Sequence, residues 1–551
     1  MTDIIPARYQ PKLPLEQLII SDGPGAEALE VDVLFVGGGP AGLSGALELT
    51  RLVRAEREQG GTIGDVSIGV LEKAGSLGEH SLSGAIVNPR VFRDLFPATA
   101  VEDLPFRQAV GREAVYFLTA HRAIRTPTPP TMNNHGFYSA SLCEAVRWLG
   151  ARAEDAGVDI FAGFPAGALL TDGTRVTGVR TTPSGLDRDG QPSAAYAEPT
   201  DVVAKVTVLA EGSRGMLAQA YREWRGIGSP NPQIFALGVK EVWETKRPLD
   251  RVVHTLGWPL PSDTFGGSWM YPMGPNQISL GLVVGLDSPR ANIDVHWLLQ
   301  RMKTHPLFRK YLEGGELLEW GAKTIPEGGY YSLPERFHGD GVLMVGDSVG
   351  LVDVPSLKGI HYAMQSGVFA ARAAFEALKR GDTSAATLGA YDRMLRESYV
   401  AEELYRTRNM RLAFKGGLLA GAAKAGVMAL TKGRAFGKQL AVPEDAAVPR
   451  RAGPALAIAP DSRLTFSKVD AVFKSGNATR DDIPSHLLVG PEVAPALADL
   501  YTSLCPAGVY EAGENGVRVA APNCVDCKAT DVLGPRWTPR EGGSGPKYRL
   551  M

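Results

Sequence analysis

The sequence predicts a mixed α/β fold, α+β over the whole chain, that is built on a buried parallel sheet. Three stretches carry this prediction: residues 31–39, 202–212 and 341–347. Each is a short run of β-branched and apolar residues that leads into glycine. Such runs are typical of strands buried on both faces of a parallel sheet. At 551 residues the chain has room for roughly two to four domains.

The composition excludes several classes of protein. A net charge of −2 excludes a generally basic nucleic-acid binder, so we expect no nucleic-acid partner. The chain has no stretch of about 18 uncharged apolar residues, so we expect no membrane-spanning helix. Its first residues lack the pattern of a secretory signal. Four cysteines in so long a chain indicate a reducing compartment.

The first of the three stretches reads as strand, glycine turn and helix. Residues 31–36 form the predicted strand, and a helical pattern follows the glycines. Gly37 permits a tight turn, Gly39 lets a pyrophosphate approach the backbone, and Gly42 lets the helix pack close to the strand. The free N–H groups and positive dipole end of the helix then face the phosphates. This order of elements predicts a dinucleotide-binding site.

A second predicted strand, residues 66–71, ends at Glu72. A carboxylate at this place can accept hydrogen bonds from both hydroxyls of an adenosine ribose. The separation along the sequence between Gly42 and Glu72 exceeds the usual ~20 residues, and the polar insert at residues 54–65 accounts for the excess. The alternative is an ordinary α/β crossover with a surface acid.

The two later stretches add FAD to this prediction. Glu211 and Gly212 match the second fingerprint of FAD proteins, where the chain passes the adenine side again. Asp347, which follows Gly346, suits a ribityl hydroxyl. Gly359 precedes a helix whose N-terminus can face the flavin pyrimidine and stabilise negative charge there. Three fingerprints in this order predict an FAD-binding, Rossmann-like two-domain flavoprotein with discontinuous domains.

Residues ~230–335 read as mostly β, a broad sheet of the kind that covers a flavin ring and forms the substrate side. Gly266 and Gly267 lie within one of its strands. Paired glycines in a strand indicate a place where a ligand or another backbone comes close.

A basic apolar segment occupies residues 408–434. It holds six basic residues, five glycines and no acid, with Leu, Phe, Val and Met between the charges. It is too charged to span a membrane and suits the membrane interface against anionic lipid. The alternative is an amphipathic helix packed on the core.

Three of the four cysteines lie near the C-terminus. Cys505 precedes a proline, and Cys524 and Cys527 form a CxxC loop. Iron–sulfur clusters are held in this way, by thiolates from a short loop and one from elsewhere. Zinc is the alternative, but three cysteines without a nearby histidine leave it short of ligands. A third reading is three buried thiols. Cys143, in a predicted helix at residues 139–156, reads as a core thiol.

Taken together, the motifs resemble the electron transfer flavoprotein–ubiquinone oxidoreductase family from about residue 30 to the end. The resemblance rests on GGGPAGLS, LEKAGSLGEHSLSGA, MNNHG, EGSRG, HTLGWPL, FGGSWMY, GLVVGLD, LKGIHYAMQSG, CPAGVYE, NCVDCK and EGGSGPKY. It implies FAD-binding, quinone-binding and cluster domains. It also implies monotopic membrane attachment, through the region after Glu72 and through residues 408–434, and quinone binding near Gly266 and Gly267. The expected division is an N-terminal arm (1–30), an FAD domain (31–118, 200–225, 336–407), a quinone domain (119–199, 226–335), a membrane-surface segment (408–434) and an iron–sulfur domain of ferredoxin-like type (450–551).

The chain departs from the family pattern at one position of the cysteine loop. The family has Cys-x-x-Cys-x-x-Cys there, which with the Cys-Pro cysteine gives four thiolates to a [4Fe–4S] cluster. Here Cys505, Cys524 and Cys527 match, and the fourth position is Thr530. A [3Fe–4S] cluster, a non-thiolate ligand such as Asp531, Thr530 or water, and a labile or absent cluster remain open.

The resemblance implies an electron-transferring-flavoprotein dehydrogenase. Such an enzyme accepts electrons from reduced electron transfer flavoprotein and passes them through FAD and the cluster to a membrane quinone, ubiquinone or menaquinone. It is peripheral on the inner or cytoplasmic membrane and faces the cytoplasm or matrix. The chemistry requires no general acid–base pair, so no catalytic residue is assigned. The alternatives are an FAD-dependent reductase or monooxygenase of the geranylgeranyl-reductase type and a non-enzymatic membrane flavoprotein.

Overall fold

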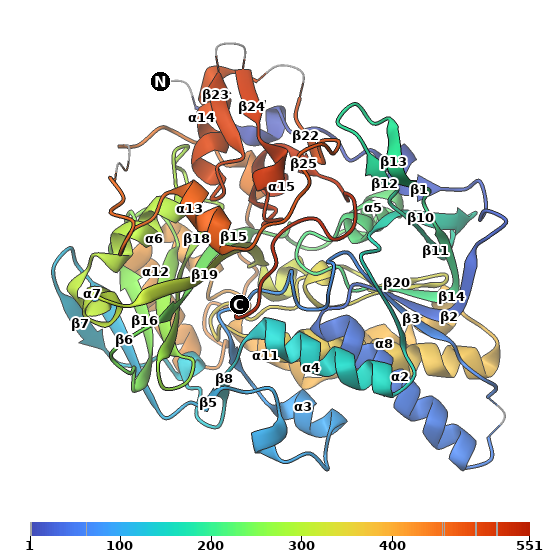
Figure 1. The fold of residues 1–551 in the computed structure, drawn as a ribbon. Helices are drawn as coiled ribbons and strands as arrows, with labels where there is room; N and C mark the ends of the chain where they lie inside the picture. Colours follow the sequence, from blue (N-terminus) through green and yellow to red (C-terminus); the bar gives the residue numbers. More distant parts are fainter. Residues whose placement is uncertain (1–2, 62, 455, 457, 491–492, 514–515) are drawn as a thin grey trace.

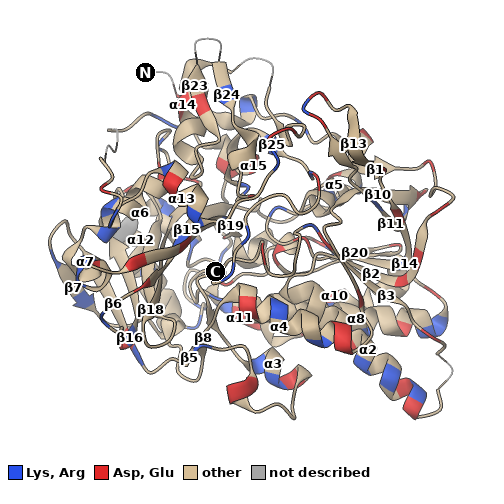
Figure 2. Ribbon diagram, viewed as in Figure 1, with Lys and Arg blue, Asp and Glu red and all other residues tan. Residues whose placement is uncertain are grey.

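The computed structural model describes the chain except for residues 1–2, 62, 455, 457, 491–492 and 514–515. Two large sheets lie side by side, with helices α2, α4 and α8 beneath one of them and the C-terminal elements, drawn in red, across the region where the two sheets meet (Figure 1). Acidic and basic residues are mixed along α2 and α4 (Figure 2), in keeping with the small net charge.

The first sheet has a parallel centre and an antiparallel edge. Strands β14, β2, β3 and β9 run parallel in that order, β21 also pairs parallel with β14, and β10 and β11 extend the sheet as an antiparallel hairpin. The strands are β1 (Ile19–Ile20), β10 (Ala166–Asp172), β11 (Arg175–Thr181), β14 (Asp201–Leu209), β2 (Leu29–Val36), β3 (Ile68–Glu72), β9 (Asp159–Ala162), β20 (His338–Gly339) and β21 (Val342–Met344).

The predicted strand–helix–strand unit is confirmed as β2, α2 (Pro40–Glu58) and β3. Two of its glycines are required by their surroundings. Gly37 has φ 119°, and a Cβ there would lie 2.4 Å from the Ala210 carbonyl oxygen. A Cβ at Gly42 would lie 2.1 Å from the carbonyl oxygen of Gly37. The turn therefore brings the ends of β2 and β14 and the start of α2 into direct backbone contact.

Helices cover the first sheet and extend around the molecule. Helix α8 packs against α2, and a Cβ at Gly367 would lie 2.0 Å from the Ala41 carbonyl oxygen. Apart from α2, the helices before residue 408 are α1 (Leu15–Leu18), α3 (Arg90–Leu95), α4 (Leu142–Asp155), α5 (Met216–Trp224), α6 (Val295–Lys303), α7 (Pro306–Leu312), α8 (Ile360–Arg380), α9 (Ala385–Leu388), α10 (Ala390–Arg396) and α11 (Tyr399–Thr407). Cys143 is buried in α4, as predicted.

The second sheet has the order β19-β15-β18-β17-β16-β6-β7. Its strands are β19 (Glu316–Pro326), β15 (Phe235–Glu244), β18 (Gln277–Gly285), β17 (Gly266–Pro272), β16 (Arg251–Gly257), β6 (Arg112–Leu118) and β7 (Ala123–Thr126). This corrects two predicted boundaries. Strand β6 belongs here and not with residues 31–118, whereas β9, β10 and β11, which we placed in the range 119–199 of the quinone domain, belong to the first sheet. An alternating strand pattern does not specify the sheet that the strand joins.

The C-terminal region consists of short elements held by loops. They are α13 (Lys468–Lys474), β22 (Leu487–Leu488), α14 (Pro495–Leu504), β23 (Tyr510–Gly513), β24 (Gly516–Val519), α15 (Ala529–Leu533) and β25 (Arg536–Trp537). Strand β22 pairs with β25, and β23 with β24. The hairpin and CxxC loop bring Cys505, Cys524 and Cys527 together in the buried interior.

The basic apolar segment divides into a buried part and an exposed helix. Arg408 and Arg411 are buried, so these two cations do not belong to an exposed surface, which corrects the predicted start of the segment. A 3-10 turn, Leu412–Gly416, leads into α12 (Leu418–Leu430), on which Leu430 is 80% exposed. None of the helices within the described residues combines the length and apolar content needed to cross a membrane.

Candidate functional site

A cavity of about 750 Å³ lies between the two sheets and receives residues from both. Its volume is in the range that holds cofactors. The cavity brings together nearly all of the residues that the sequence singled out for FAD and quinone: Gly37, Gly39, Glu72, Glu211, Gly212, Gly266, Gly267, Gly346, Asp347 and Gly359. Gly42 lies outside the lining and acts through the packing of α2 on the turn.

The first wall is formed by the β2–α2 turn and the end of β3. Helix α2 begins at Pro40 after Gly39, and within the described part of the chain no side chain caps its N-terminus. A Cβ on Gly39 would meet no atom within 4 Å, so the helix end opens into the cavity. The Glu72 carboxylate is held at the edge by the amides of Gly38 (3.0 Å) and Ala74 (2.8 Å). Unpaired amides and an open backbone suit a pyrophosphate, and the anchored carboxylate suits a ribose.

Two further carboxylates differ in their surroundings. Glu211 accepts hydrogen bonds from the amides of Leu217 (3.1 Å) and Ala218 (2.8 Å) and so anchors the start of α5. Burial raises the pKa of Glu211, and Lys528 opposes the shift. Burial likewise raises the pKa of Asp347 to about 6. Glu211 is therefore tied mainly to the backbone, while Asp347 lines the part of the cavity nearest α8.

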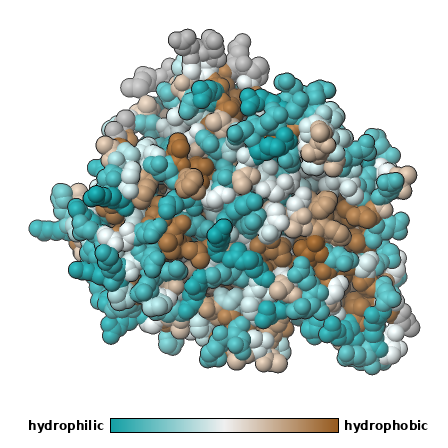
Figure 3. Space-filling view, in the orientation of Figure 1, coloured by the Kyte–Doolittle hydropathy of each residue, from teal (hydrophilic) through white to brown (hydrophobic). Residues whose placement is uncertain are grey.

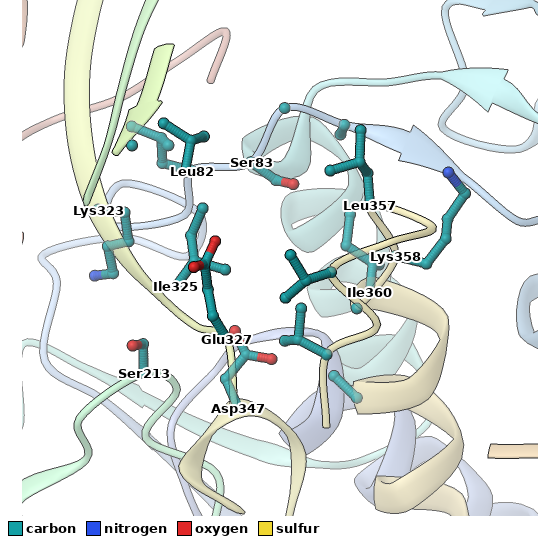
Figure 4. Close-up of a pocket in the computed structure, with 18 of the residues that line it drawn as sticks. Leu82, Ser83, Ser213, Lys323, Ile325, Glu327, Asp347, Leu357, Lys358 and Ile360 are labelled. Carbon is teal, nitrogen blue, oxygen red and sulfur yellow. The ribbon is translucent and has the colours of Figure 1, made fainter. Parts of the chain in front are cut away.

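Figure 4 shows the cavity between Ile325 on one wall and Leu357 and Ile360 on the other, with the carboxylates of Glu327 and Asp347 directed into it. Leu357 and Ile360 flank the start of α8, where Gly359 provides no side-chain cap. The positive end of this long helix thus faces the cavity and favours negative charge there. Helix ends, carboxylates and an open glycine turn together fit FAD.

The cavity continues along β17 to helix α12. Gly266 and Gly267 line it, and neighbouring strands leave no room for a side chain at either position. A Cβ on Gly266, for example, would lie 2.2 Å from the Val283 carbonyl oxygen. Beyond them the lining is mostly apolar, with Arg411 beside it, and includes Phe265, Met410, Phe414, Ala422, Ala425, Gly426, Ala429 and Leu430. A small-residue face of an exposed helix therefore lines the far end of the cavity.

Sequence reasoning missed a buried ion network beside this apolar end. Arg411 donates from Nε to Glu327 (2.6 Å) and from Nη2 to Asp287 (2.9 Å), and its guanidinium lies 3.8 Å from the Phe265 ring centre. Burial raises the pKa of Glu327, whereas Arg411 holds the pKa of Asp287 low. The motif GLVVGLD contained Asp287, but nothing in the local pattern linked it to Arg411, 124 residues away.

A second, smaller cavity lies in the C-terminal region. Cys505, Cys524, Cys527, Tyr510 and Thr530 line it. Burial raises the pKa of all three thiols, that of Cys524 to about 12, so they need a cation to be stable as thiolates. A nearby cation opposes the shift at each thiol: Lys468 at Cys505, Arg540 at Cys524 and Lys323 at Cys527. The donor set thus fits an iron–sulfur cluster with three thiolates.

Strand β19 connects the two cavities, a link that the sequence did not predict. The Thr324 amide donates to the Cys527 carbonyl (3.0 Å), and the Thr324 hydroxyl lies 3.0 Å from that of Ser213. Thr324, Ser213 and Lys323 all line the large cavity. Burial lowers the pKa of Lys323 to about 8. One strand thus carries residues of the FAD cavity on a backbone that is bonded to the cysteine loop.

Comparison with known proteins identifies both regions. A family model described as "ETF-QO, ubiquinone-binding" matches residues 235–325. Another, described as "Electron transfer flavoprotein-ubiquinone oxidoreductase, 4Fe-4S", matches residues 462–549. The first covers the second sheet from β15 to β19, and the second contains the three cysteines.

Relatives match over nearly the whole chain. The mitochondrial electron transfer flavoprotein-ubiquinone oxidoreductase of Oryza sativa is 36% identical, covering 96% of this chain and 94% of its own. The Homo sapiens protein of that name is 35% identical (95% and 90%), and a probable one from Acinetobacter baylyi is 35% identical (95% and 99%).

Solved structures resemble the fold. A geranylgeranyl bacteriochlorophyll reductase-like protein from Thermoplasma acidophilum gives a TM-score of 0.56 at 19% identity, covering 74% of this chain and 93% of that one. A flavin-dependent brominase gives 0.51 at 18% identity, covering 74% and 94%. Both support the FAD-binding flavoprotein fold alone.

Proposed function

The chain belongs to the electron transfer flavoprotein–ubiquinone oxidoreductase family of electron-transferring-flavoprotein dehydrogenases, and from this premise we propose that it oxidises reduced electron transfer flavoprotein and reduces a quinone drawn from the membrane. Its cofactors are FAD and an iron–sulfur cluster. The geranylgeranyl-reductase alternative is not favoured, because the relatives at 35–36% identity and the cluster-domain match all belong to this family.

One observation carries the proposed route to the quinone. A single cavity extends from the glycine turn at Gly37, past Gly266 and Gly267, to Ala425 and Gly426 of α12. A quinone has a polar ring and an apolar tail, so it fits a cavity whose lining changes from carboxylates and amides to alanine, glycine and phenylalanine. We place the quinone ring near Gly266 and Gly267 and the entrance at α12.

We further propose that α12 rests in the membrane interface and that the protein is a peripheral protein of the inner or cytoplasmic membrane. Leu430 is 80% and Val427 44% exposed, and Lys424 and Lys432 flank them on the exposed surface. Apolar side chains with flanking lysines suit anionic lipid. With α12 in the membrane, a quinone enters the cavity without crossing water.

FAD, when bound, can hold one or two electrons and so joins a one-electron donor to a two-electron acceptor. The residues of the chain bind and tune it. The N-terminus of α2 and the backbone at Gly39 would hold the pyrophosphate, and Glu72 the ribose. The N-terminus of α8, next to Asp347, would face the ring and favour negative charge on it. Glu327, kept in place by Arg411, is an acid within the cavity that can hold a proton.

The test is quinone reduction by the holoenzyme in lipid vesicles with reduced electron transfer flavoprotein as donor. We expect turnover with a membrane quinone. Gly426→Phe, which places a ring in the apolar end, should lower quinone turnover, whereas Ala423→Phe, on the same helix but outside the cavity lining, should not. Absence of turnover with any quinone would refute the proposal, and equal turnover of the two variants would refute the route along α12.

A further inference from the structure

The cluster cavity lacks a fourth thiol. The chain has four cysteines, and three of them line the cavity. The fourth, Cys143, is buried in α4, where it packs with Val242 and Tyr548 and donates to the Ser81 carbonyl (3.0 Å). Cys143 is not part of the lining of the cluster cavity. A [4Fe–4S] cluster normally takes four cysteine thiolates, so one corner of the site needs another ligand or stays without one.

Thr530 lines the cavity and stands at the position where the family pattern has its fourth cysteine. It follows Cys527 by three residues, is buried in the first turn of α15, and lines the cavity together with the thiols. Its hydroxyl lies 3.3 Å from that of Tyr510, which also lines the cavity. Apart from the three thiols, the lining therefore includes a pair of hydroxyls, together with Lys528, Trp537 and apolar residues. A neutral hydroxyl is a far weaker iron ligand than a thiolate.

The nearby carboxylates are engaged elsewhere. Asp531 accepts from Arg214 Nε (2.6 Å) and from the Trp537 amide (3.1 Å). Asp526 accepts from Lys73 Nζ (2.6 Å) on one oxygen, and from Arg540 (2.9 Å) and Trp537 Nε1 on the other. Neither carboxylate is part of the cavity lining. Ligation by either would leave a buried cation without its partner, which is unfavourable.

Two histidines lie close to the loop: His80, whose Nδ1 is 3.9 Å from an Asp526 oxygen, and His486, which lies nearer to a thiol. His486 is buried, and among the described residues neither of its ring nitrogens has a hydrogen-bond partner. A ring nitrogen of His486, the Cys524 sulfur and an Asp526 oxygen lie within 4.8 Å of one another. His486 does not line the cavity, however, so it approaches Cys524 from outside the space that the three thiols enclose. It is thus the competing ligand that a test must detect.

We propose that the cluster site of this chain would bind a three-iron [3Fe–4S] cluster through Cys505, Cys524 and Cys527, because the position of the fourth thiolate is taken by Thr530. In such a cluster each iron takes one thiolate, which matches the three thiols present. The inference deepens the proposed function, since it specifies the cluster of the same enzyme. It rests on the cavity lining and on the positions of Thr530, Cys143, Asp526 and Asp531.

The experiment compares the wild-type holoprotein with Thr530→Cys and Thr530→Ser, all expressed and purified without oxygen. Iron per chain, Mössbauer spectra and low-temperature EPR before and after dithionite are measured. The wild type and Thr530→Ser should contain about three irons, with an EPR signal in the oxidised protein that reduction removes. Thr530→Cys should contain about four irons, with a signal that appears only on reduction. The FAD-to-protein ratio shows whether each variant is folded.

Several results would overturn the proposal. Wild-type protein with about four irons and a signal only on reduction would mean that another group ligates the fourth iron. A magnetic coupling between the cluster and ¹⁵N-labelled histidine in the EPR measurement, if it is lost in His486→Ala, would show that His486 is this ligand. Wild-type protein without iron, or Thr530→Cys that keeps about three irons, would also refute it. These measurements need neither donor nor quinone, so failure of quinone reduction would refute the proposed function and leave the cluster assignment intact.

Discussion

Replacing the exposed apolar side chains of α12 should weaken membrane binding by a calculable amount. Fully burying a leucine or valine side chain is worth about 1.5–3 kcal/mol. Scaled by the exposed fractions, 80% for Leu430 and 44% for Val427, the two together contribute about 2–4 kcal/mol. Interfacial burial is incomplete, so we take the lower value. The double variant Val427→Ser/Leu430→Ser should therefore bind vesicles roughly thirtyfold more weakly.

The assay is co-flotation with vesicles that contain anionic lipid, at several salt concentrations. The matched control is Val469→Ser/Phe473→Ser on α13, where the two side chains are 68% and 83% exposed. A control outside α12 is needed because exposed apolar residues occur in several parts of the surface, as the separate brown areas in Figure 3 illustrate. If the α13 variant loses as much binding as the α12 variant, or if neither loses any, then α12 is not the attachment site.

Three further predictions concern the cavity and its surroundings. Gly37→Ala should retain little FAD, because its Cβ would lie 2.4 Å from the Ala210 carbonyl oxygen, whereas Gly111→Ala, with open space, should keep a normal absorbance ratio of FAD to protein. Burial raises the pKa of Asp445 to about 8 in the folded state, whereas in the unfolded state the carboxyl releases its proton near its ordinary pKa. Between these two pKa values only the folded state holds the proton, so stability falls as the pH rises. Asp445→Asn should therefore reduce the loss of Tm between about pH 5 and pH 8, and an unchanged slope would contradict this. Lys323→Met should lower the midpoint potential of the FAD or the cluster in an anaerobic redox titration, because a buried cation favours an added electron. Lys323→Arg, which keeps the cation, should restore the potential. Equal potentials in the wild type and both variants would refute a role of Lys323 in setting the potential.

Sequence alone predicted the parts of the site that depend on short-range constraints. Gly42 is fixed by its contact with Gly37 within one turn, Gly37 by its positive φ of 119°, and Glu72 and Asp347 by their positions at or just after the ends of β3 and β21. Strand ends of a parallel sheet meet at one edge, so residues that follow such strands converge whatever the length of the chain between them. The same reasoning holds for Cys524 and Cys527, which share one loop.

Long-range partnerships escaped prediction. Arg411 reads as one of six cations in a basic segment, and only the fold reveals that Glu327 and Asp287 hold it in the interior. The sequence of the hairpin β10–β11 is compatible with either of the two sheets. The pairing of β11 with β14 places it in the first sheet. In both cases the deciding contact is a tertiary one that local periodicity does not record.

The cluster region also forms part of the FAD cavity, and this makes the two cofactor sites interdependent. Lys528, one residue after Cys527, lines the large cavity together with Trp537, and its amino group donates to the Arg214 carbonyl (2.9 Å) beside Gly212. The Thr324 amide ties the other wall to the Cys527 carbonyl. The loop that carries Cys527 and Lys528 thus contacts both walls of the FAD cavity, so a change in the backbone of this loop would reach the lining near Glu211 and Gly212 as well as the cysteine site.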